Sequence, residues 1–189
     1  RKQNRSIGIS EDEIIKIAIK SLGLDELSPF DPKERIIEYK LREGNSEPLL
    51  KMDLRQFANE TASESPAPGG GSISAYAGAL GVSLGVMVAN LSSHKRGWDD
   101  KWELYSDWAE KGMKIQKQLL AMVDEDTNAF NRIMDAFGLP KSSDAEKVAR
   151  KKAISDATRN AIEVPFKVME LCLESMEVMK EMADIGNPN

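Results

Sequence analysis

Apolar residues recur with a helical period along most of the chain, and this pattern predicts an all-α protein. One long amphipathic stretch covers residues 98–137 and ends at Gly138, and a second covers residues 142–183, opened by a serine-rich cap. Pro165 lies inside the second stretch and should kink it, because the carbonyl of Ala161 loses its N–H donor there. The expected fold is a helical bundle with long antiparallel helices.

A Gly/Ala-rich run precedes these stretches. The sequence ISAYAGALGVSLGVMVANL carries no charge, and the nearest charges are Glu64 and Lys95. About 20 apolar residues suffice to span a membrane, but transfer of Ala, Gly and Ser into hydrocarbon is weakly favourable at best. Small residues such as Gly78, Gly81 and Gly85 allow other helices to approach closely. The pattern therefore favours a central, buried helix of the bundle, and no membrane is expected as a partner.

The N-terminal quarter of the chain has a different pattern. Residues 10–22 predict a short amphipathic helix that opens with a capping box, a serine followed three positions later by a glutamate. Residues 24–39 contain two prolines and predict a short α/β-type linker whose last part, residues 35–39, is strand-like. The polar run at residues 42–48 marks a boundary between two units. Helical periodicity resumes after Asp53, a predicted cap.

Composition narrows the classes of function. The 26 basic and 31 acidic residues give a net charge of −5, so nucleic acid is not an expected partner. The single cysteine, Cys172, cannot form an intramolecular disulfide and falls on an apolar face, as an inert core thiol does. No charged-then-apolar leader opens the chain, so a cytoplasmic location is expected. One histidine and one cysteine leave too few ligands for zinc, and no metal is expected.

The chain breaks sharply at residues 66–72, where three glycines, Gly69, Gly70 and Gly71, precede the apolar run. A glycine backbone can approach a ligand closely, and helix-start amides can hold an anion. Ser72 is expected at the cap position. The spacing matches neither the phosphate loop nor the dinucleotide fingerprint. Two interpretations stay open, a tight structural turn and a ligand-binding loop.

Asp126 is the acid that the helical pattern places among apolar residues. Its neighbours on the predicted face are Leu119, Met122, Phe130 and Ile133. An acid on such a face is costly unless it has a partner. Desolvation would favour the protonated carboxyl and suit it to proton transfer, whereas a basic partner would keep it ionised. The pattern is equally compatible with a purely structural role, in which Asp126 pairs with a neighbouring helix. Asp124 is expected to face a polar, solvated side.

Three basic or titratable residues, His94, Lys95 and Arg96, directly follow the Gly/Ala-rich run. Cations in the last turn of a helix are stabilised by the helix dipole, which would be a structural role for each of them. Together they would also suit an acidic ligand.

Taken together, several runs resemble the formiminotransferase-cyclodeaminase family and its relatives among the methenyltetrahydrofolate cyclohydrolases. The runs, in order, are SPAPGGGSISAYAGALGVSLGVMVANL, HKRGW, LLAMVDEDTNAFNRIMDAFGLPK and the closing IGN. The resemblance spans about residues 52–187. Within residues 1–43, GLDELSPFDPKERIIEY resembles the end of a formiminotransferase domain. The expected domains are therefore a transferase remnant with its linker at 1–43 and a cyclodeaminase domain at 44–189 that lacks its C-terminal end.

This resemblance implies a homodimer or higher homo-oligomer that binds polyglutamylated folate near a subunit interface. The implied reaction converts 5-formiminotetrahydrofolate to 5,10-methenyltetrahydrofolate and ammonia, within histidine degradation and one-carbon metabolism, and needs no metal. In the full-length enzymes a formiminotransferase domain adds glutamate formimidoyltransferase activity. Asp126 matches the second acid of the family's D-x-D segment and is the implied proton carrier. Folate contacts are implied for Pro68, Gly69, Gly70, Gly71, Ser72, Lys95 and Arg96.

One position departs from the resemblance. His94 stands where many relatives carry glycine, so it is either a local substitution or an aid to proton transfer. Two other functions stay open: a methenyltetrahydrofolate cyclohydrolase, in which the same pocket would serve water addition, and a non-catalytic helical oligomerisation module. Arg1 in place of a methionine and the helix stop at residues 185–189 make both ends look cut.

Overall fold

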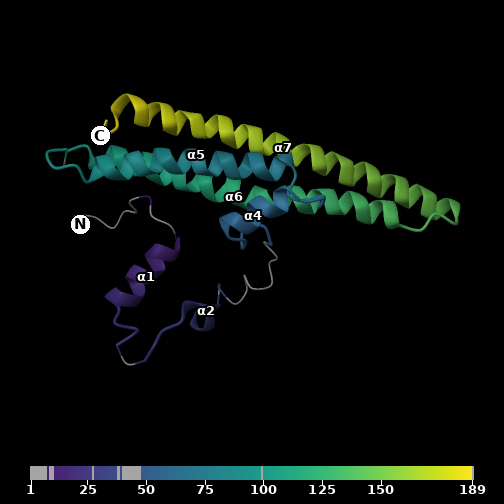
Figure 1. Ribbon diagram of the computed structural model, residues 1–189, viewed down its shortest axis with the longest axis horizontal. Helices are drawn as coiled ribbons and strands as arrows, with labels where there is room; N and C mark the ends of the chain where they lie inside the picture. Colours follow the sequence, from purple (N-terminus) through teal and green to yellow (C-terminus); the bar gives the residue numbers. More distant parts are fainter. Residues whose placement is uncertain are drawn as a thin grey trace.

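Every regular element in the described part of the chain is a helix, which confirms the all-α prediction (Figure 1). The structure, a computed structural model, describes residues 8, 11–26, 28–37, 39, 48–98 and 100–188. The helices are α1 (Glu11–Ser21), α2 (Pro32–Arg35), α4 (Leu54–Thr61), α5 (Gly70–Ser93), α6 (Trp102–Gly138) and α7 (Asp144–Ile185).

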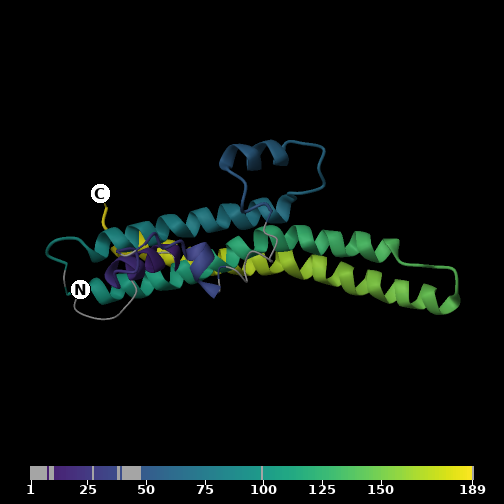
Figure 2. The ribbon, with the colours of Figure 1, turned by 90° about the horizontal axis from the view of Figure 1, so that it is seen from below.

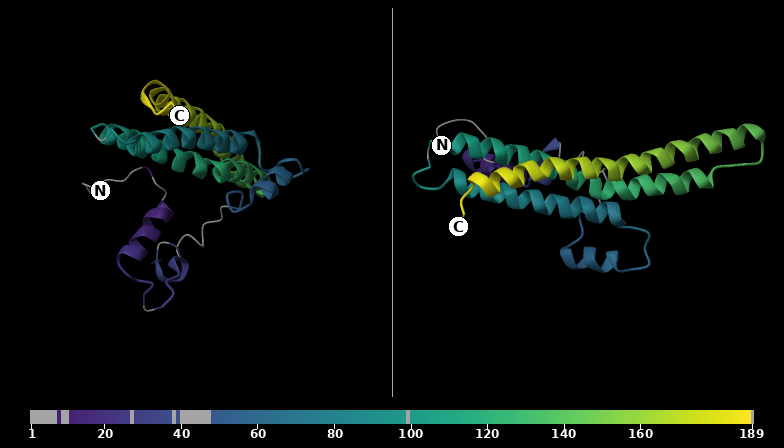
Figure 3. Two further views of the ribbon diagram at one scale, coloured as in Figure 1. Left: turned by 60° about the vertical axis from the view of Figure 1, so that its left-hand side comes forward. Right: turned by 90° about the horizontal axis from the view of Figure 1, so that it is seen from above.

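The three long helices α5, α6 and α7 lie side by side and form the bundle (Figures 1 and 3). The shorter α5 packs along part of the other two, and the rest of α6 and α7 extends beyond it as a two-helix arm. Glycines let the helices approach closely, as predicted. A Cβ on Gly78 would lie 2.6 Å from the Cys172 sulfur of α7, and one on Gly112 of α6 would overlap Val86 of α5.

The apolar helix α5 is buried on one side only. Its core residues include Ala75, Val82 and Ala89, none of which is exposed. The opposite side carries large apolar residues that are each about half exposed: Leu80, Leu84, Met87 and Leu91. In the single chain, the expected central, buried helix is thus covered on one side and exposed on the other. Among the described helices, α5 alone has the length and apolar composition to cross a membrane, a test that core helices also pass.

The strand-like prediction for residues 35–39 is wrong. Arg35 ends α2, and residues 37 and 39 are also helical. Pro32 starts the helix, at a position where its missing N–H costs no hydrogen bond. The carbonyl of Asp31 accepts the N–H groups of Glu34 (3.2 Å) and Arg35 (3.0 Å), which closes the first turn. The serine of the capping box predicted for residues 10–22 lies outside the described residues.

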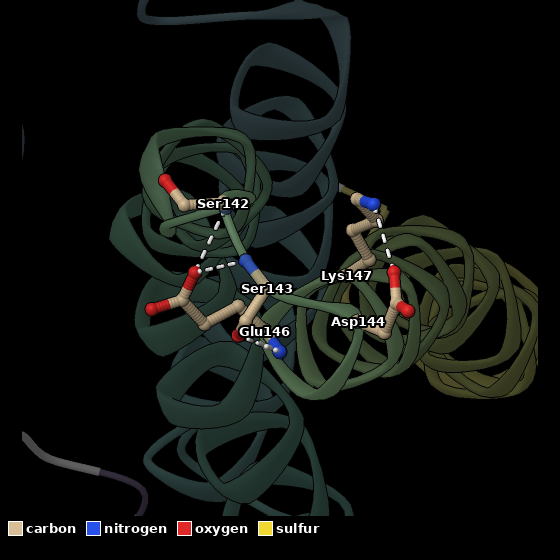
Figure 4. Close-up of polar contacts among 5 residues, drawn as sticks. All are labelled: Ser142, Ser143, Asp144, Glu146 and Lys147. Atoms are coloured by element: carbon tan, nitrogen blue, oxygen red, sulfur yellow. Dashed lines mark hydrogen bonds and ion pairs between the residues drawn. The ribbon is translucent and has the colours of Figure 1, made fainter.

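The predicted caps of the later helices are present. Asp53 caps α4 and accepts the Gln56 N–H at 2.8 Å. At the start of α7, Glu146 accepts the backbone N–H groups of Ser142 (2.8 Å) and Ser143 (2.9 Å), as Figure 4 shows. The bonds to Ser143 and then Ser142 hold the pKa of Glu146 below its usual range. Helix α7 continues through Pro165 without a break.

Candidate active site

The glycine run forms the first turn of α5 rather than a loop before it. Gly69 is the N-cap, Gly70 and Gly71 are the first two helical residues, and Ser72 is the third. The predictions of a glycine loop and of Ser72 as a cap are therefore wrong. Glycine weakens a helix. The N–H groups of the first turn have no acceptor within the helix, and here a carboxylate from another helix accepts one of them.

That carboxylate belongs to Asp126 in the middle of α6. Its Oδ2 accepts the Ser72 N–H at 3.0 Å, so an anion lies at the positive end of the α5 dipole. The Ser72 hydroxyl donates to the Val123 carbonyl at 2.7 Å and lies 3.3 Å from the same Oδ2. Because a hydroxyl has one hydrogen, and the shorter contact uses it, a protonated Asp126 can donate to Ser72 Oγ. The carboxyl group of Asp126 thus has a hydrogen-bond partner in Ser72 whether or not it carries a proton.

Gly71 makes room for this carboxylate. A Cβ at Gly71 would overlap Oδ1 and Cγ of Asp126 and would lie 2.7 Å from Oδ2. A Cβ at Gly69 would lie 3.5 Å from Oδ2, an ordinary contact, and one at Gly70 would meet nothing within 4 Å. The three glycines are therefore not equivalent, since only Gly71 is required by the approach of Asp126.

The surroundings of Asp126 match the predicted apolar face only in part. Leu119 is fully buried and Met122 packs against the core, whereas Phe130 is 41% exposed. Ile133 and Asp126 itself are half-buried. The carboxylate therefore lies at the edge of the core, where α5 begins and the two-helix arm leaves the bundle.

The prediction of a solvated Asp124 is wrong. This residue is only 4% exposed, and its two oxygens accept the backbone N–H groups of Leu49 (2.9 Å) and Leu50 (3.2 Å). The turn at Leu49 and Leu50 covers this side of α6, and the helical period of α6 does not show that cover.

The basic residues lie at the other end of α5. His94 follows the last helical residue and is exposed, as is Arg96. The Lys95 ammonium donates to the Asn187 side chain at 2.9 Å and lies 4.2 Å from the centre of the Trp98 ring. Because the 24 residues of α5 rise about 1.5 Å each, these side chains lie about 35 Å from Asp126. Within one chain they do not share its site.

Two family models match this chain. Residues 53–189 match the model described as formiminotransferase-cyclodeaminase, and residues 1–42 match the formiminotransferase domain. The chain belongs to the formiminotransferase-cyclodeaminase family.

Individual proteins of this family and of the related cyclohydrolases are also similar to the chain. The formimidoyltransferase-cyclodeaminase of Mus musculus is 36% identical over 180 residues, 95% of this chain but 33% of the relative. A methenyltetrahydrofolate cyclohydrolase of Methylorubrum extorquens is 35% identical over 136 residues, 72% of this chain and 65% of the relative. The chain therefore spans about a third of the length of the bifunctional relatives.

A solved structure carries the same fold. The formiminotetrahydrofolate cyclodeaminase of Thermotoga maritima superposes with a TM-score of 0.62 at 27% identity, over 74% of this chain and 65% of that chain. These relatives carry the names of enzymes of folate metabolism.

The closing IGN of this family member is tied to the basic end of α5, a feature that the sequence did not predict. The Asn187 N–H donates to Ser92 Oγ at 2.8 Å, and the Tyr105 hydroxyl donates to the Ile185 carbonyl at 2.7 Å. Burial, and then the charge of Asp100, raise the pKa of Tyr105 above its usual value. Among the described residues, no three His, Cys, Asp or Glu side chains lie together as a metal site would need.

Proposed function

We propose that this chain carries the cyclodeaminase activity of its family and closes 5-formiminotetrahydrofolate to 5,10-methenyltetrahydrofolate with release of ammonia. The observation that supports this most strongly is that the Asp126 side chain of α6 contacts the first turn of α5. Gly71 leaves room for the carboxylate, and the Ser72 N–H donates to it. Folate as the substrate class is supported by the activities for which the relatives are named.

The reaction needs one proton carrier. N10 attacks the carbon of the protonated formimino group, so an N10–C bond forms and N10 must lose its proton. The departing nitrogen gains a proton, the C–N bond to it breaks, and ammonia leaves. The cation is retained as the methenyl bridge between N5 and N10. The net change inside the site is therefore transfer of one proton from N10 to the leaving nitrogen, together with stabilisation of a cation.

Asp126 meets both needs in this proposal. Its carboxylate faces the cationic amidine, accepts the N10 proton and gives it to the leaving nitrogen. While it is protonated, Ser72 Oγ offers an acceptor 3.3 Å away. The amides of Gly70 and Gly71 lie in the first turn of α5, where a helix provides no partner, and in this proposal they bind an oxygen of folate beside Pro68.

The basic residues enter this proposal through a second copy of the chain. The exposed apolar residues of α5 have the spacing of a helix–helix seam: Leu80, Leu84, Met87 and Leu91. An antiparallel pair of α5 helices that matched Leu80 with Leu91 would bring residue 95 of one copy opposite residue 76 of the other. Position 76 lies one turn after Ser72. In this arrangement Lys95 and Arg96 hold the folate carboxylates of the neighbouring site, with His94 beside them.

Mixing two inactive variants tests this shared site. Asp126→Asn removes the proton carrier and Lys95→Ala removes a carboxylate ligand, so each variant alone should lose ammonia release. In a mixed dimer one of the two sites contains neither change, so mixing should restore activity to about a quarter of the unmixed wild-type value. Leu84→Ala in both partners is the control that weakens the seam itself. Persistent inactivity of mixtures that do exchange subunits would contradict the shared site.

A methenyltetrahydrofolate cyclohydrolase is the second candidate, because the Methylorubrum extorquens relative carries that name at 35% identity. In that reaction water, rather than an internal nitrogen, adds to the one-carbon bridge. Assays of the two substrates side by side separate the candidates. The proposal expects ammonia release from 5-formiminotetrahydrofolate to be the faster reaction, and faster hydrolysis of 5,10-methenyltetrahydrofolate would reverse the assignment.

A further inference from the structure

The buried carboxylate of Asp124 plays no part in the proposed reaction, although it lies two residues before Asp126. Residues two apart on a helix point to different sides, and Asp124 points to the segment at residues 48–50. A buried carboxylate is costly unless its oxygens are paired. Here Oδ1 accepts the Leu49 N–H at 2.9 Å and Oδ2 accepts the Leu50 N–H at 3.2 Å, so each oxygen holds one amide of the same turn.

The segment held in this way lies between the two family matches, which end at residue 42 and begin at residue 53. The Leu49 side chain is 5% exposed and belongs to the main core cluster. The next element, α4, has no fully buried residue, and it reaches α5 through its Phe57 ring, which lies 5.4 Å from the Tyr76 ring (Figure 2). Residues 48–50 are therefore a firmly docked stretch of the connector, fixed before α4 begins.

The transferase-like segment itself touches the same bundle further along. Asn90 of α5 donates to the Gly8 carbonyl at 3.2 Å, and a Cβ on Gly8 would overlap the Cβ of Ala109 in α6. Residues 8 and 49 thus contact α6 at positions 109 and 124. Between them, helices α1 and α2 lie away from the bundle (Figure 1).

We propose that Asp124 is the anchor that fixes the connector between the transferase segment and the cyclodeaminase bundle. A charged acceptor for two consecutive amides holds a turn in one orientation, which an apolar contact through Leu49 alone would not do. The anchor and Asp126 share one turn of α6. Residues 48–50 of the connector are therefore fixed relative to the helix that carries the proposed proton carrier.

Amide hydrogen exchange resolved by residue tests the anchor in the 189-residue chain. In Asp124→Asn the side chain keeps one acceptor oxygen, and its NH2 group opposes the second amide. We expect exchange at Leu49 and Leu50 to accelerate about tenfold or more, with Ser72 unchanged. Asp126→Asn is the matched control on the same turn, and it should leave Leu49 and Leu50 protected, because neither amide binds Asp126. Tryptic cleavage after the exposed Lys51 should increase in the first variant alone.

Wild-type exchange at Leu49 and Leu50 in folded Asp124→Asn protein would overturn the anchor. If that variant does not fold, Leu50→Pro deletes one of the two amide donors and leaves Asp124 intact. The Leu49 amide keeps its own bond to Asp124 in that variant, so tryptic cleavage after Lys51 is the measurement. Cleavage should increase, and cleavage at the wild-type rate would overturn the anchor. Ammonia release measured on the same samples keeps the two proposals apart. Asp126→Asn with full turnover would remove the proposed reaction, but the pattern of exchange at Leu49 and Leu50 would still decide the anchor.

Discussion

Replacing Gly71 by alanine puts a methyl group where Asp126 holds the start of α5. The new Cβ would overlap Oδ1 and lie 2.7 Å from Oδ2. The carboxylate must rotate away, and the Ser72 N–H then loses its acceptor. A hydrogen bond to a charged group stabilises by about 1.5–3 kcal/mol, and alanine in place of glycine returns about 1 kcal/mol of helix stability. We therefore expect Gly71→Ala to lower the free energy of unfolding by about 0.5–2 kcal/mol.

Two comparisons isolate this contact. Gly70→Ala adds the same methyl group one residue earlier, where nothing lies within 4 Å, so it should leave the free energy of unfolding unchanged or raise it by up to about 1 kcal/mol. Asp126→Ala removes the carboxylate, and in that background Gly71→Ala should itself become stabilising. The coupling energy between positions 71 and 126 should then be about 1.5–3 kcal/mol.

Urea unfolding followed by far-UV circular dichroism measures all four free energies, provided that the dependence on urea concentration is the same in each variant. If Gly71→Ala changes the free energy of unfolding by the same amount with and without the Asp126 carboxylate, the reasoning is refuted. The glycine would then be present for some reason other than the approach of that side chain.

Four further outcomes are expected. Ser143→Ala removes the side-chain cap of α7 and should destabilise the chain by about 1 kcal/mol in the same unfolding assay. Ser142→Ala is the control, since the Ser142 side chain is not the cap, and it should leave the free energy of unfolding unchanged. Because the pKa of Glu146 is lowered on folding, its contribution to stability is present above the unfolded pKa and is lost as pH falls through the folded value, so Glu146→Gln should flatten the acid side of the stability profile. Tyr105→Phe leaves the Ile185 carbonyl without its donor and should lower stability by about 1 kcal/mol at neutral pH; an unchanged midpoint would contradict that. Leu84→Glu places a charge on the exposed face of α5 and should shift the sedimenting species towards monomer, whereas a dimer that persists at the same concentration would place the seam elsewhere.

The long helices could be predicted from the sequence because their evidence is local. Periodicity and the caps at Asp53 and Ser143 lie within a few residues of the elements that they define. The strand-like prediction for residues 35–39 failed because a helical turn started by Pro32 outweighs the β-propensity of two isoleucines in so short a stretch.

The candidate site could be predicted only for the residues that the sequence pattern or the resemblance distinguishes. Gly71 and Asp126 were each identified from the sequence, and the structure brings them together across 55 residues of chain. The burial of Asp124 was missed because a helical wheel shows which side a residue faces but not what covers that side. The separation of Lys95 from Asp126 follows from the length of α5, which is one continuous helix. The resemblance assigned both residues to one site, but it did not give the distance between the two ends of that helix.

The central claim is that Asp126, held at the start of α5, carries the proton that leaves with ammonia. The most direct test is the kcat for ammonia release from 5-formiminotetrahydrofolate by Asp126→Asn, compared with wild type. Asparagine keeps an oxygen that can accept the Ser72 N–H, so circular dichroism should be unchanged. The account predicts a fall in kcat of about 10²–10⁴-fold. A folded variant that turns over at the wild-type rate would contradict it.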